Sequence, residues 1–295
     1  MSDTQDAIVV GIDGSETSLR ALRWAAAIAG KRHEPLHVVY AFAPLAGFYG
    51  AGLPVLHEAY DDLRGAGRKV LDEAVRTARE TAGENVRITS EMPNDPPVPL
   101  LVDRSRRARM LVLGCSGAGG FTGMLAGSTT VAVSAHAECP VVVVRGRDVG
   151  EGPVVAGVDG SAIGDRALGM AFDEASRRDA LLVAVHSWSD DEFTGYYGTL
   201  PLAVDWDEIE ADEQRLLAER LAGWQEKYPE VTVERVVVRD RPRHQLLEWS
   251  GRAQLVVVGS RGRGGFKGLL LGSTGQALIH HAQCPVMIVR PGPAR

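Results

Sequence analysis

The 295-residue sequence has few cysteines and no long apolar run, and each absence excludes a class of protein. Its three cysteines, Cys115, Cys139 and Cys284, cannot all pair within one chain, which argues against a secreted disulfide framework. No apolar stretch approaches the roughly 20 residues that a membrane-spanning helix needs. Residues 1–7 lack the apolar core of a signal peptide. We therefore expect a cytoplasmic protein with no membrane partner.

An excess of basic residues is also missing. Lysine and arginine together number 32 against 38 aspartate and glutamate residues, a formal net charge of −6. A dedicated nucleic-acid binder normally carries a basic face, so we expect no nucleic-acid partner. The basic run from Arg104 to Arg109 is the local exception. Because cations stabilise the last turn of a helix, a solvated helix end is favoured there over a patch for an anionic partner.

Several motifs of known chemistry do not occur. The lysine-bearing GxxxxGK[ST] loop is absent, and neither half has GxGxxG after its first strand, which disfavours P-loop NTPases and dinucleotide oxidoreductases. His136 with Cys139, and His281 with Cys284, each give half the ligands of a structural zinc site. Buried cysteines beside histidines that end helices are the simpler interpretation.

What the sequence does contain is a glycine motif that occurs twice. The first copy is repeated at a constant offset of 145 residues: Gly114, Gly117, Gly127, Ser128 and Thr129 recur as Gly259, Gly262, Gly272, Ser273 and Thr274. Near the start of each half, Ile8–Ser15 is echoed by Val154–Ser161 at an offset of 146. A period this long indicates duplicated domains, since solenoid repeats have about 20–50 residues. We place the domains at 1–147 and 148–295.

Within each half, short apolar strands alternate with helical segments. In the first half we expect strands at Ile8–Ile12, Leu36–Phe42, Val86–Glu91, Met110–Gly114 and Val141–Val144. In the second half we expect them at Val154–Val158, Leu181–Trp188, Val231–Val238, Leu255–Gly259 and Val286–Val289. This order predicts an α/β fold of two tandem doubly wound domains, each a parallel sheet with helices on both faces. Ligands bind to such sheets beyond the carboxyl ends of the strands, where the strand order reverses.

The repeated residues at this edge are suited to an anion. Glycines let backbone N–H groups approach phosphates, and the following Ser-Thr pair would open a helix whose positive end favours negative charge. The alternative is that the glycines only make turns. Asp13 and Asp159 would accept hydrogen bonds from ribose hydroxyls or help to hold a hydrated Mg²⁺. Their alternative role is an Asx-turn that caps the next helix, and both roles can coexist.

These residues resemble those of tandem universal stress proteins over essentially the full length. Nucleotide-binding members of that family carry Gly, two residues, Gly, nine residues, Gly and then Ser or Thr, and both halves match this pattern. The resemblance implies adenine nucleotide alpha hydrolase-like domains of five parallel strands, ATP as the ligand, and pairing of the domains through their last strands. A homodimer stays open. The implied nucleotide contacts are Asp13, Gly114, Gly117, Gly127, Ser128, Thr129, Asp159, Gly259, Gly262, Gly272, Ser273 and Thr274 and, by position alone, Ala41 and Ser187 against the adenine.

Two classes of function fit such a site: binding of a nucleotide without turnover, and catalysis. Beyond Asp13 and Asp159, no repeated acid, histidine or lysine lies near the glycine loops to supply the groups that phosphoryl transfer requires. The sequence therefore favours a nucleotide-dependent regulatory or stress-response protein. A slow ATPase or phosphoryl transferase, and a scaffold with vestigial sites, are the alternatives.

Two further features bear on the ligand. The aromatic segments Gly47–Gly50 and Gly195–Gly198 would either close over a bound base or form ordinary surface loops. Arg261 and Arg263 occupy the positions that Ser116 and Ala118 hold in the first half. This difference predicts unequal sites, with stronger phosphate binding in the second half.

Overall fold

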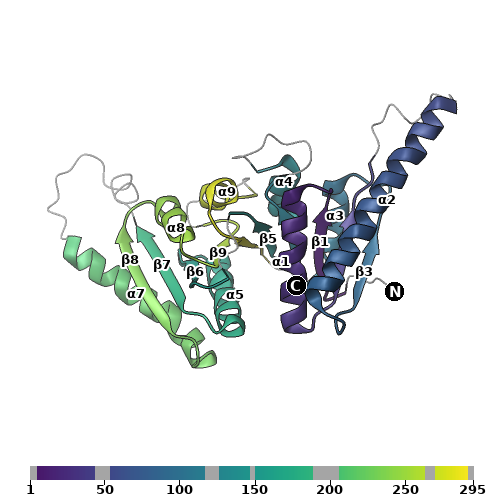
Figure 1. Cartoon of the computed structure of the whole chain (residues 1–295). Coiled ribbons are helices and arrows are strands. Elements are labelled where there is room, and N and C mark those ends of the chain that lie inside the picture. Colours follow the sequence, from purple (N-terminus) through teal and green to yellow (C-terminus); the bar gives the residue numbers. More distant parts are fainter. Residues whose placement is uncertain are drawn as a thin grey trace, which may run out of the picture. The chain divides into compact units, whose positions relative to one another are not determined.

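The computed structural model describes residues 5–43, 54–116, 126–146, 150–188, 206–262 and 270–291 (Figure 1). These residues form two compact units, which divide between Arg145 and Gly146. The predicted domain boundary after residue 147 falls within 147–149, outside the described residues, and it stays a prediction. So do the pairing of the domains through their last strands and a homodimer.

The first unit is a parallel sheet covered by helices. Its strands are β1 (Ile8–Ile12), β2 (Leu36–Tyr40), β3 (Ile88–Glu91), β4 (Met110–Gly114) and β5 (Val141–Val144). Its helices are α1 (Glu16–Arg32), α2 (Pro54–Ala82), α3 (Pro97–Ser105) and α4 (Ser128–His136). The strands lie in the order β3-β2-β1-β4-β5, and every pair is parallel. Helix α1 packs beside α2 and α3 beside α4, one pair on each face of the sheet (Figure 1).

The second unit repeats this architecture. Its strands are β6 (Val154–Gly157), β7 (Leu182–Trp188), β8 (Val233–Arg239), β9 (Leu255–Gly259) and β10 (Val286–Val289). Its helices are α5 (Ala162–Arg178), α7 (Trp206–Lys227), α8 (Pro242–Ser250) and α9 (Ser273–His281). The parallel order β8-β7-β6-β9-β10 matches that of the first unit, which confirms the predicted pair of doubly wound domains with five parallel strands each.

The central strands form the core of each unit. Every residue of β5 is buried, and Val9 of β1, Val112 of β4 and Val142 of β5 are fully shielded from solvent. Strands covered on both faces must be apolar along their whole length, which explains why these segments show runs rather than alternation. Burying one such valine stabilises the fold by about 1.5–3 kcal/mol. Strand β8, at the edge of its sheet, carries exposed Glu234 and Arg235 instead.

In each sheet, the order in which the strands are added reverses between the first and fourth strands. It proceeds from β1 outward through β2 and β3, then returns to β4 on the other side of β1. The carboxyl ends of β1 and β4 are therefore neighbours that lead into helices on opposite faces. This is the place where doubly wound sheets bind ligands. In the second unit, β6 and β9 have the same relation.

The repeated GxDGS segment forms the turn after the first strand of each unit. Gly14 and Gly160 have φ angles of 82° and 72°, a left-handed conformation that glycine adopts without steric cost. The next residue, Ser15, caps α1 by accepting a hydrogen bond from the Ser18 backbone N–H at 3.2 Å. Ser161 caps α5 in the same way. The motif therefore fixes where these helices begin.

Within the described residues, no helix is both long and apolar enough to cross a membrane.

Candidate functional site

A cavity of about 520 Å³ lies at the carboxyl edge of the first sheet. It lies where β1 and β4 end, and residues from the ends of β1, β2 and β4 line it together with the start of α4. The predicted site residues that line it are Asp13, Ala41, Gly114, Gly127, Ser128 and Thr129. The fold thus brings together, in one space, segments that are up to 116 positions apart, from Asp13 to Thr129. Gly117 lies outside the described residues.

The helix that faces this cavity begins without a side-chain cap. Gly127 occupies the N-cap position of α4, and as a glycine it has no side chain to accept a hydrogen bond from the first turn. Gly272 does the same for α9. Helices α1 and α5, by contrast, are capped by serine hydroxyls. Because the first N–H groups of a helix need acceptors, the glycine-capped starts of α4 and α9 are suited to bind an anion.

Backbone hydrogen bonds close the glycine loop at its base. The Gly127 N–H donates to the Cys115 carbonyl at 2.7 Å, and the Thr130 hydroxyl donates to the Gly114 carbonyl at 2.8 Å. The Thr17 hydroxyl donates to the Ser116 carbonyl, which ties the loop to α1. The carboxyl end of β4 and the start of α4 are therefore held next to each other, independently of any ligand.

The second unit closes its loop in the same way. The Gly272 N–H donates to the Ser260 carbonyl at 2.7 Å. A Cβ on Gly272 would lie 3.6 Å from the Cα of Arg261 and 4.0 Å from the N of Gly262. A Cβ on Gly259 would lie 3.3 Å from the N of Gly164, at the start of α5. Gly262 thus lies next to Gly272 at the beginning of α9, which opens with Ser273 and Thr274, and Gly259 lies beside the start of α5.

The repeated aspartates, Asp13 and Asp159, form the Asx-turns that the sequence offered as their alternative role. Oδ1 of Asp13 accepts hydrogen bonds from the Ser15 N–H at 3.0 Å and the Ser15 hydroxyl at 2.6 Å. Asp159 makes the same two bonds to Ser161, at 3.0 and 2.8 Å. The turn occupies one carboxylate oxygen. Oδ2 of Asp159 lies 2.7 Å from where a Cβ on Gly262 would stand, so this carboxylate also adjoins the glycine loop.

The two positions expected to contact the adenine lie at the carboxyl end of the second strand of each sheet. Ala41 lines the cavity directly after β2, and Ser187 is the penultimate residue of β7. The hydroxyl of Ser187 is buried, with no hydrogen-bond partner among the described residues. An unsatisfied buried hydroxyl costs about 1–3 kcal/mol, which marks this position as one where a polar ligand atom would be stabilising.

Sequence reasoning missed an aromatic cluster beside Ala41. The ring of Phe42 packs edge-to-face on Tyr60 of α2, with centroids 5.5 Å apart. The Asn94 amide donates to the Tyr60 hydroxyl at 3.1 Å. The cluster lies at the ends of β2 and β3 and near the start of α2, and thus adjoins the end of the cavity at Ala41.

The second unit has a matching cluster of different residues. Trp188 and Trp206 stack with centroids 6.1 Å apart, and the guanidinium of Arg239 lies 3.8 Å from the centre of the Trp206 ring. The offset of 146 relates these rings to Phe42 and Tyr60, because 188 − 42 and 206 − 60 both equal 146. This equal offset was the signal that would have found them. The aromatic segments Gly47–Gly50 and Gly195–Gly198, which were considered instead, lie outside the described residues.

The chain's relatives come from one family. A family model described as the universal stress protein family matches residues 5–145 and again 152–290. The chain belongs to the universal stress protein family. A universal stress protein of Mycobacterium tuberculosis is 43% identical over 294 residues, which cover 96% of each chain. One of Mycolicibacterium smegmatis is 40% identical over 297 residues, which cover 98% of this chain and 99% of the relative.

A solved universal stress protein shares the fold. The crystal structure of a universal stress protein from Archaeoglobus fulgidus DSM 4304 matches with a TM-score of 0.71 and 21% identity. The match covers 98% of this chain and 99% of that one. The fold of the present chain is therefore also found in a solved universal stress protein.

The two universal stress protein domains differ beneath their repeated aspartates. His186 of β7 lies with Nδ1 2.7 Å from the Val158 carbonyl oxygen and Nε2 2.6 Å from Oε2 of Glu213 on α7. In the first domain Tyr40 takes the place of His186, and its ring packs against Gly67 of α2. Burial, and then the charge of Asp13, raise the pKa of Tyr40. Position 67, which matches Glu213, is a glycine. The larger ring of Tyr40 therefore accompanies the loss of the side chain that faces it.

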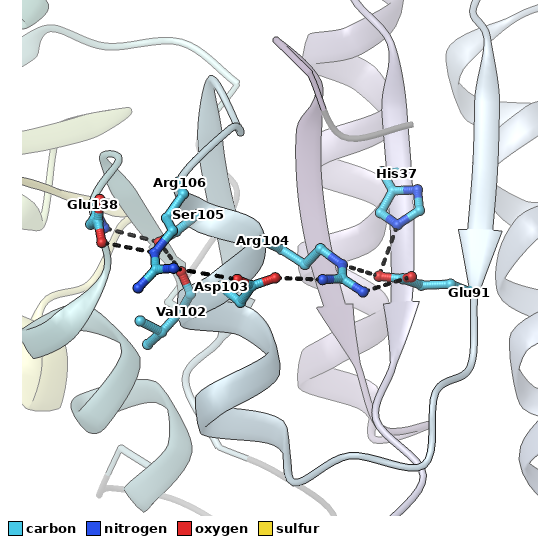
Figure 2. A network of polar contacts seen from close by, with 8 residues as sticks. All are labelled: His37, Glu91, Val102, Asp103, Arg104, Ser105, Arg106 and Glu138. Atoms are coloured by element: carbon cyan, nitrogen blue, oxygen red, sulfur yellow. Dashed lines mark hydrogen bonds and ion pairs between the residues drawn. The ribbon is translucent and has the colours of Figure 1, made fainter. Parts of the chain in front are cut away.

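The sequence suggested that the basic run at the end of α3 is solvated, but several of its arginines pair with carboxylates of the chain. Figure 2 shows Arg104 between Glu91 and Asp103, with two hydrogen bonds of 2.6 and 3.1 Å to Glu91 and one of 2.7 Å to Asp103. Arg106 reaches Glu138 at 3.1 Å, and Arg109 reaches Glu34 at the same distance. These partners belong to the chain itself. Arg104 is 26% exposed and held by two carboxylates, whereas Arg106 and Arg109 are 60% and 41% exposed and remain solvated, as expected.

The carboxylate at the centre of this network is strongly acidic. Oε1 of Glu91 lies 3.2 Å from Nε2 of the buried His37. Its hydrogen bonding with His37, and then with Arg104, lowers the pKa of Glu91 to about 2. None of these residues lines the cavity. The network therefore serves the packing of α3 on the sheet edge.

Cys139 and Cys284 are buried like small apolar residues, and His136 and His281 lie at the ends of helices. Cys139 and Cys284 are 5% and 0% exposed, and none of the three cysteines forms a disulfide. Burial raises the pKa of the Cys139 thiol to about 12. His136 lies in the last turn of α4, with Nδ1 2.8 Å from the Ala132 carbonyl oxygen. The described residues contain no group of three or more potential metal ligands.

Proposed function

We propose that both domains bind an adenine nucleotide, ATP above all, and that occupancy makes this chain a nucleotide-dependent regulator in the response to stress. The observation that carries the proposal is the cavity of the first domain, where the glycine-capped start of α4 and the carboxylate of Asp13 line one space. Its volume of about 520 Å³ suits a ligand of nucleotide size.

The cavity offers different chemistry at its two ends. The N–H groups of Ser128 and Thr129, with the hydroxyls of both residues, would receive the phosphates. Ala41 and Val39, at the end of β2, offer the apolar contact that a base requires. Asp13 lies between these groups in the strand order, where it would accept hydrogen bonds from ribose hydroxyls. The matching residues of the second domain are Asp159, Ser187, Ser273 and Thr274, with the hydroxyl of Ser187 in place of the methyl group of Ala41.

The donor set also fits Mg²⁺. A hard cation prefers carboxylate and phosphate oxygens, and the Asp13 carboxylate lines the same cavity as the start of α4. Bound there with water ligands, Mg²⁺ would neutralise phosphate charge. The residue that would hold it is Asp13, and Asp159 in the second domain.

Regulation is favoured over turnover by the composition of the cavity lining. Among the described lining residues, Asp13 is the only one with a charged side chain. Phosphoryl transfer needs an oriented nucleophile, neutralisation of charge and usually a positioned base. One carboxylate that already holds the Asp13–Ser15 turn does not supply that set.

Three measurements on the full chain test the proposal. Nucleotide released by denaturing freshly purified protein is identified by mass spectrometry, binding is titrated by calorimetry, and phosphate release is followed over many turnovers. We expect tightly bound ATP with negligible release. Absence of any adenine nucleotide in both binding measurements would refute the proposal. Sustained release that the double substitution Asp13→Ala with Asp159→Ala abolishes would establish the alternative, an ATPase.

A pair of glycine substitutions separates binding from folding. Gly272→Ala places its Cβ 3.5 Å from the Ser260 carbonyl oxygen, an ordinary contact, so the fold should tolerate it. The same Cβ lies at the start of α9, where it narrows the approach of a phosphate. Gly223→Ala, on an exposed face of α7 with no heavy atom within 4 Å of its Cβ, is the matched control. We expect the first substitution alone to weaken binding at the second domain.

A further inference from the structure

The two glycine loops carry different charges. This inference rests on the proposed nucleotide binding and concerns which nucleotide each domain prefers. Between Gly114 and Thr129 the first loop has no charged residue, whereas the second has Arg261, Arg263 and Lys267 and no acid. The backbone of the two loops is closed by the same hydrogen bond, from Gly127 to Cys115 and from Gly272 to Ser260. The side-chain charge is therefore what differs.

Arg261 lies at the entrance of the second loop. Its Cα is 3.6 Å from where a Cβ on Gly272 would stand, so Arg261 adjoins the glycine-capped start of α9. Its Nε is buried and has no hydrogen-bond partner among the described residues. A charged donor shielded from water without an acceptor is costly. An anion bound at α9 would supply that acceptor.

A second guanidinium lies close to the first. Arg290 directly follows β10, and the Ser260 N–H donates to the carbonyl of the preceding residue, Val289, at 2.8 Å. The Nη1 of Arg290 donates to the Leu270 carbonyl at 2.8 Å. Burial, and then the neighbouring charge of Arg261, lower the pKa of Arg290. The charges of Arg261 and Arg290 repel each other, and a polyanion bound between them would relieve this repulsion.

The first domain lacks one member of this pair. Arg145 follows β5 as Arg290 follows β10, since 290 − 145 equals 145. At the position of Arg261 stands Ser116, whose carbonyl accepts the hydrogen bond from Thr17. Among the described positions of the two loops, the difference in charge therefore resides in one matched pair, 116 and 261.

We propose that the second domain selects nucleotides by their number of phosphates, through Arg261 supported by Arg290, whereas the first domain, with Ser116, discriminates weakly. The second site is then the triphosphate site. The first accepts adenine nucleotides of lower charge nearly as well. Charge-assisted hydrogen bonds of this kind change affinity by about ten- to a hundredfold.

Titration of the full chain with ATP, ADP and AMP tests this. Calorimetry of the wild type should resolve two classes of site, one with a steep preference for ATP and one nearly indifferent. Arg261→Ser should lower the ratio of ATP to AMP affinity at the steep class by about tenfold or more. Ser116→Arg should raise that ratio at the other class. Arg261→Gln, which keeps the aliphatic stem, repeats the test in case serine perturbs packing.

Arg220→Ser is the control, because it removes the same charge from an exposed position on α7. It should leave both ratios unchanged. If both Arg261 variants keep the wild-type ratio within about twofold while nucleotides still bind, the inference is wrong and the proposed function stands. If none of the three nucleotides binds, the proposed function fails, and this inference fails with it.

Discussion

The ion pair that anchors α3 should make the first domain sensitive to acid. In the folded chain Glu91 has a pKa of about 2, against 4.5 for the ordinary carboxyl group, because of His37 and then Arg104. A difference of this size corresponds to about 3 kcal/mol at neutral pH. The Glu91 side chain is 26% exposed, so solvent screening reduces the value to about 1–2 kcal/mol.

The sign follows from the direction of the shift. A carboxyl group with a lowered pKa in the folded state stabilises the fold at pH values above its unfolded pKa. That stabilisation is lost as the pH falls from about 4.5 to about 2. Glu91→Gln should therefore destabilise the first domain by about 1–2 kcal/mol at pH 7. Near pH 2 the variant and the wild type should be equally stable.

The assay must report each domain separately, since two domains need not unfold together. Urea-dependent hydrogen exchange followed by mass spectrometry does so, because peptides from each domain are read independently. The second domain provides an internal reference: its matching positions hold Val183, Val236 and Trp249, and its stability should not change in the variant.

Glu138→Gln is the control substitution. Glu138 is 43% exposed and pairs with Arg106, itself 60% exposed, so its removal should cost no more than about 0.5 kcal/mol. A Glu91→Gln effect as small as that of the control, or one that persists unchanged near pH 2, would refute the electrostatic account of the network.

Three further predictions follow from packing and burial. Gly169→Ala should destabilise the second domain by about 2 kcal/mol in urea unfolding, because the new Cβ would lie 2.3 Å from Cη2 of Trp224. Gly65→Ala, in the exposed part of α2 with no heavy atom within 4 Å of its Cβ, should instead stabilise the first domain by about 0.5–1 kcal/mol. Cys139 should resist alkylation at pH 8 until the domain unfolds, because its thiol is 5% exposed and has a pKa of about 12; rapid labelling of the folded chain would contradict this.

The order of elements was predictable because parallel strands that are covered on both faces must be apolar. Met110–Gly114 and Val141–Val144 could be recognised as strands from their own residues, and their predicted bounds agree with β4 and β5. The end of the second strand could not be placed this way. The sequence suggested Leu36–Phe42, but β2 ends at Tyr40, which pairs with Ile12, the last residue of β1. In the second domain β8 continues to Arg239, so β7 extends to Trp188.

The candidate site likewise has a part that the sequence predicts and a part that only the fold reveals. The glycine loops and the aspartates could be found in the sequence because the duplication repeats them at a fixed spacing. The contacts of the arginine run could not be found, since Glu91, Glu138 and Glu34 are distant in sequence and only the fold brings them to α3 and β4. The contribution of α2 was missed for the same reason, because Tyr60 meets Phe42 only after the second crossover is formed.

The differences between the two domains are themselves ordered. Where the first domain places Tyr40 against Gly67, the second places His186 against Glu213, and both pairs join the end of the second strand to the long helix. Exchange of one member alone would create either a collision or a cavity, since the tyrosine ring fills the space that the glutamate side chain needs. The duplication has therefore kept the backbone of the glycine loop while the side chains around it changed in matched sets.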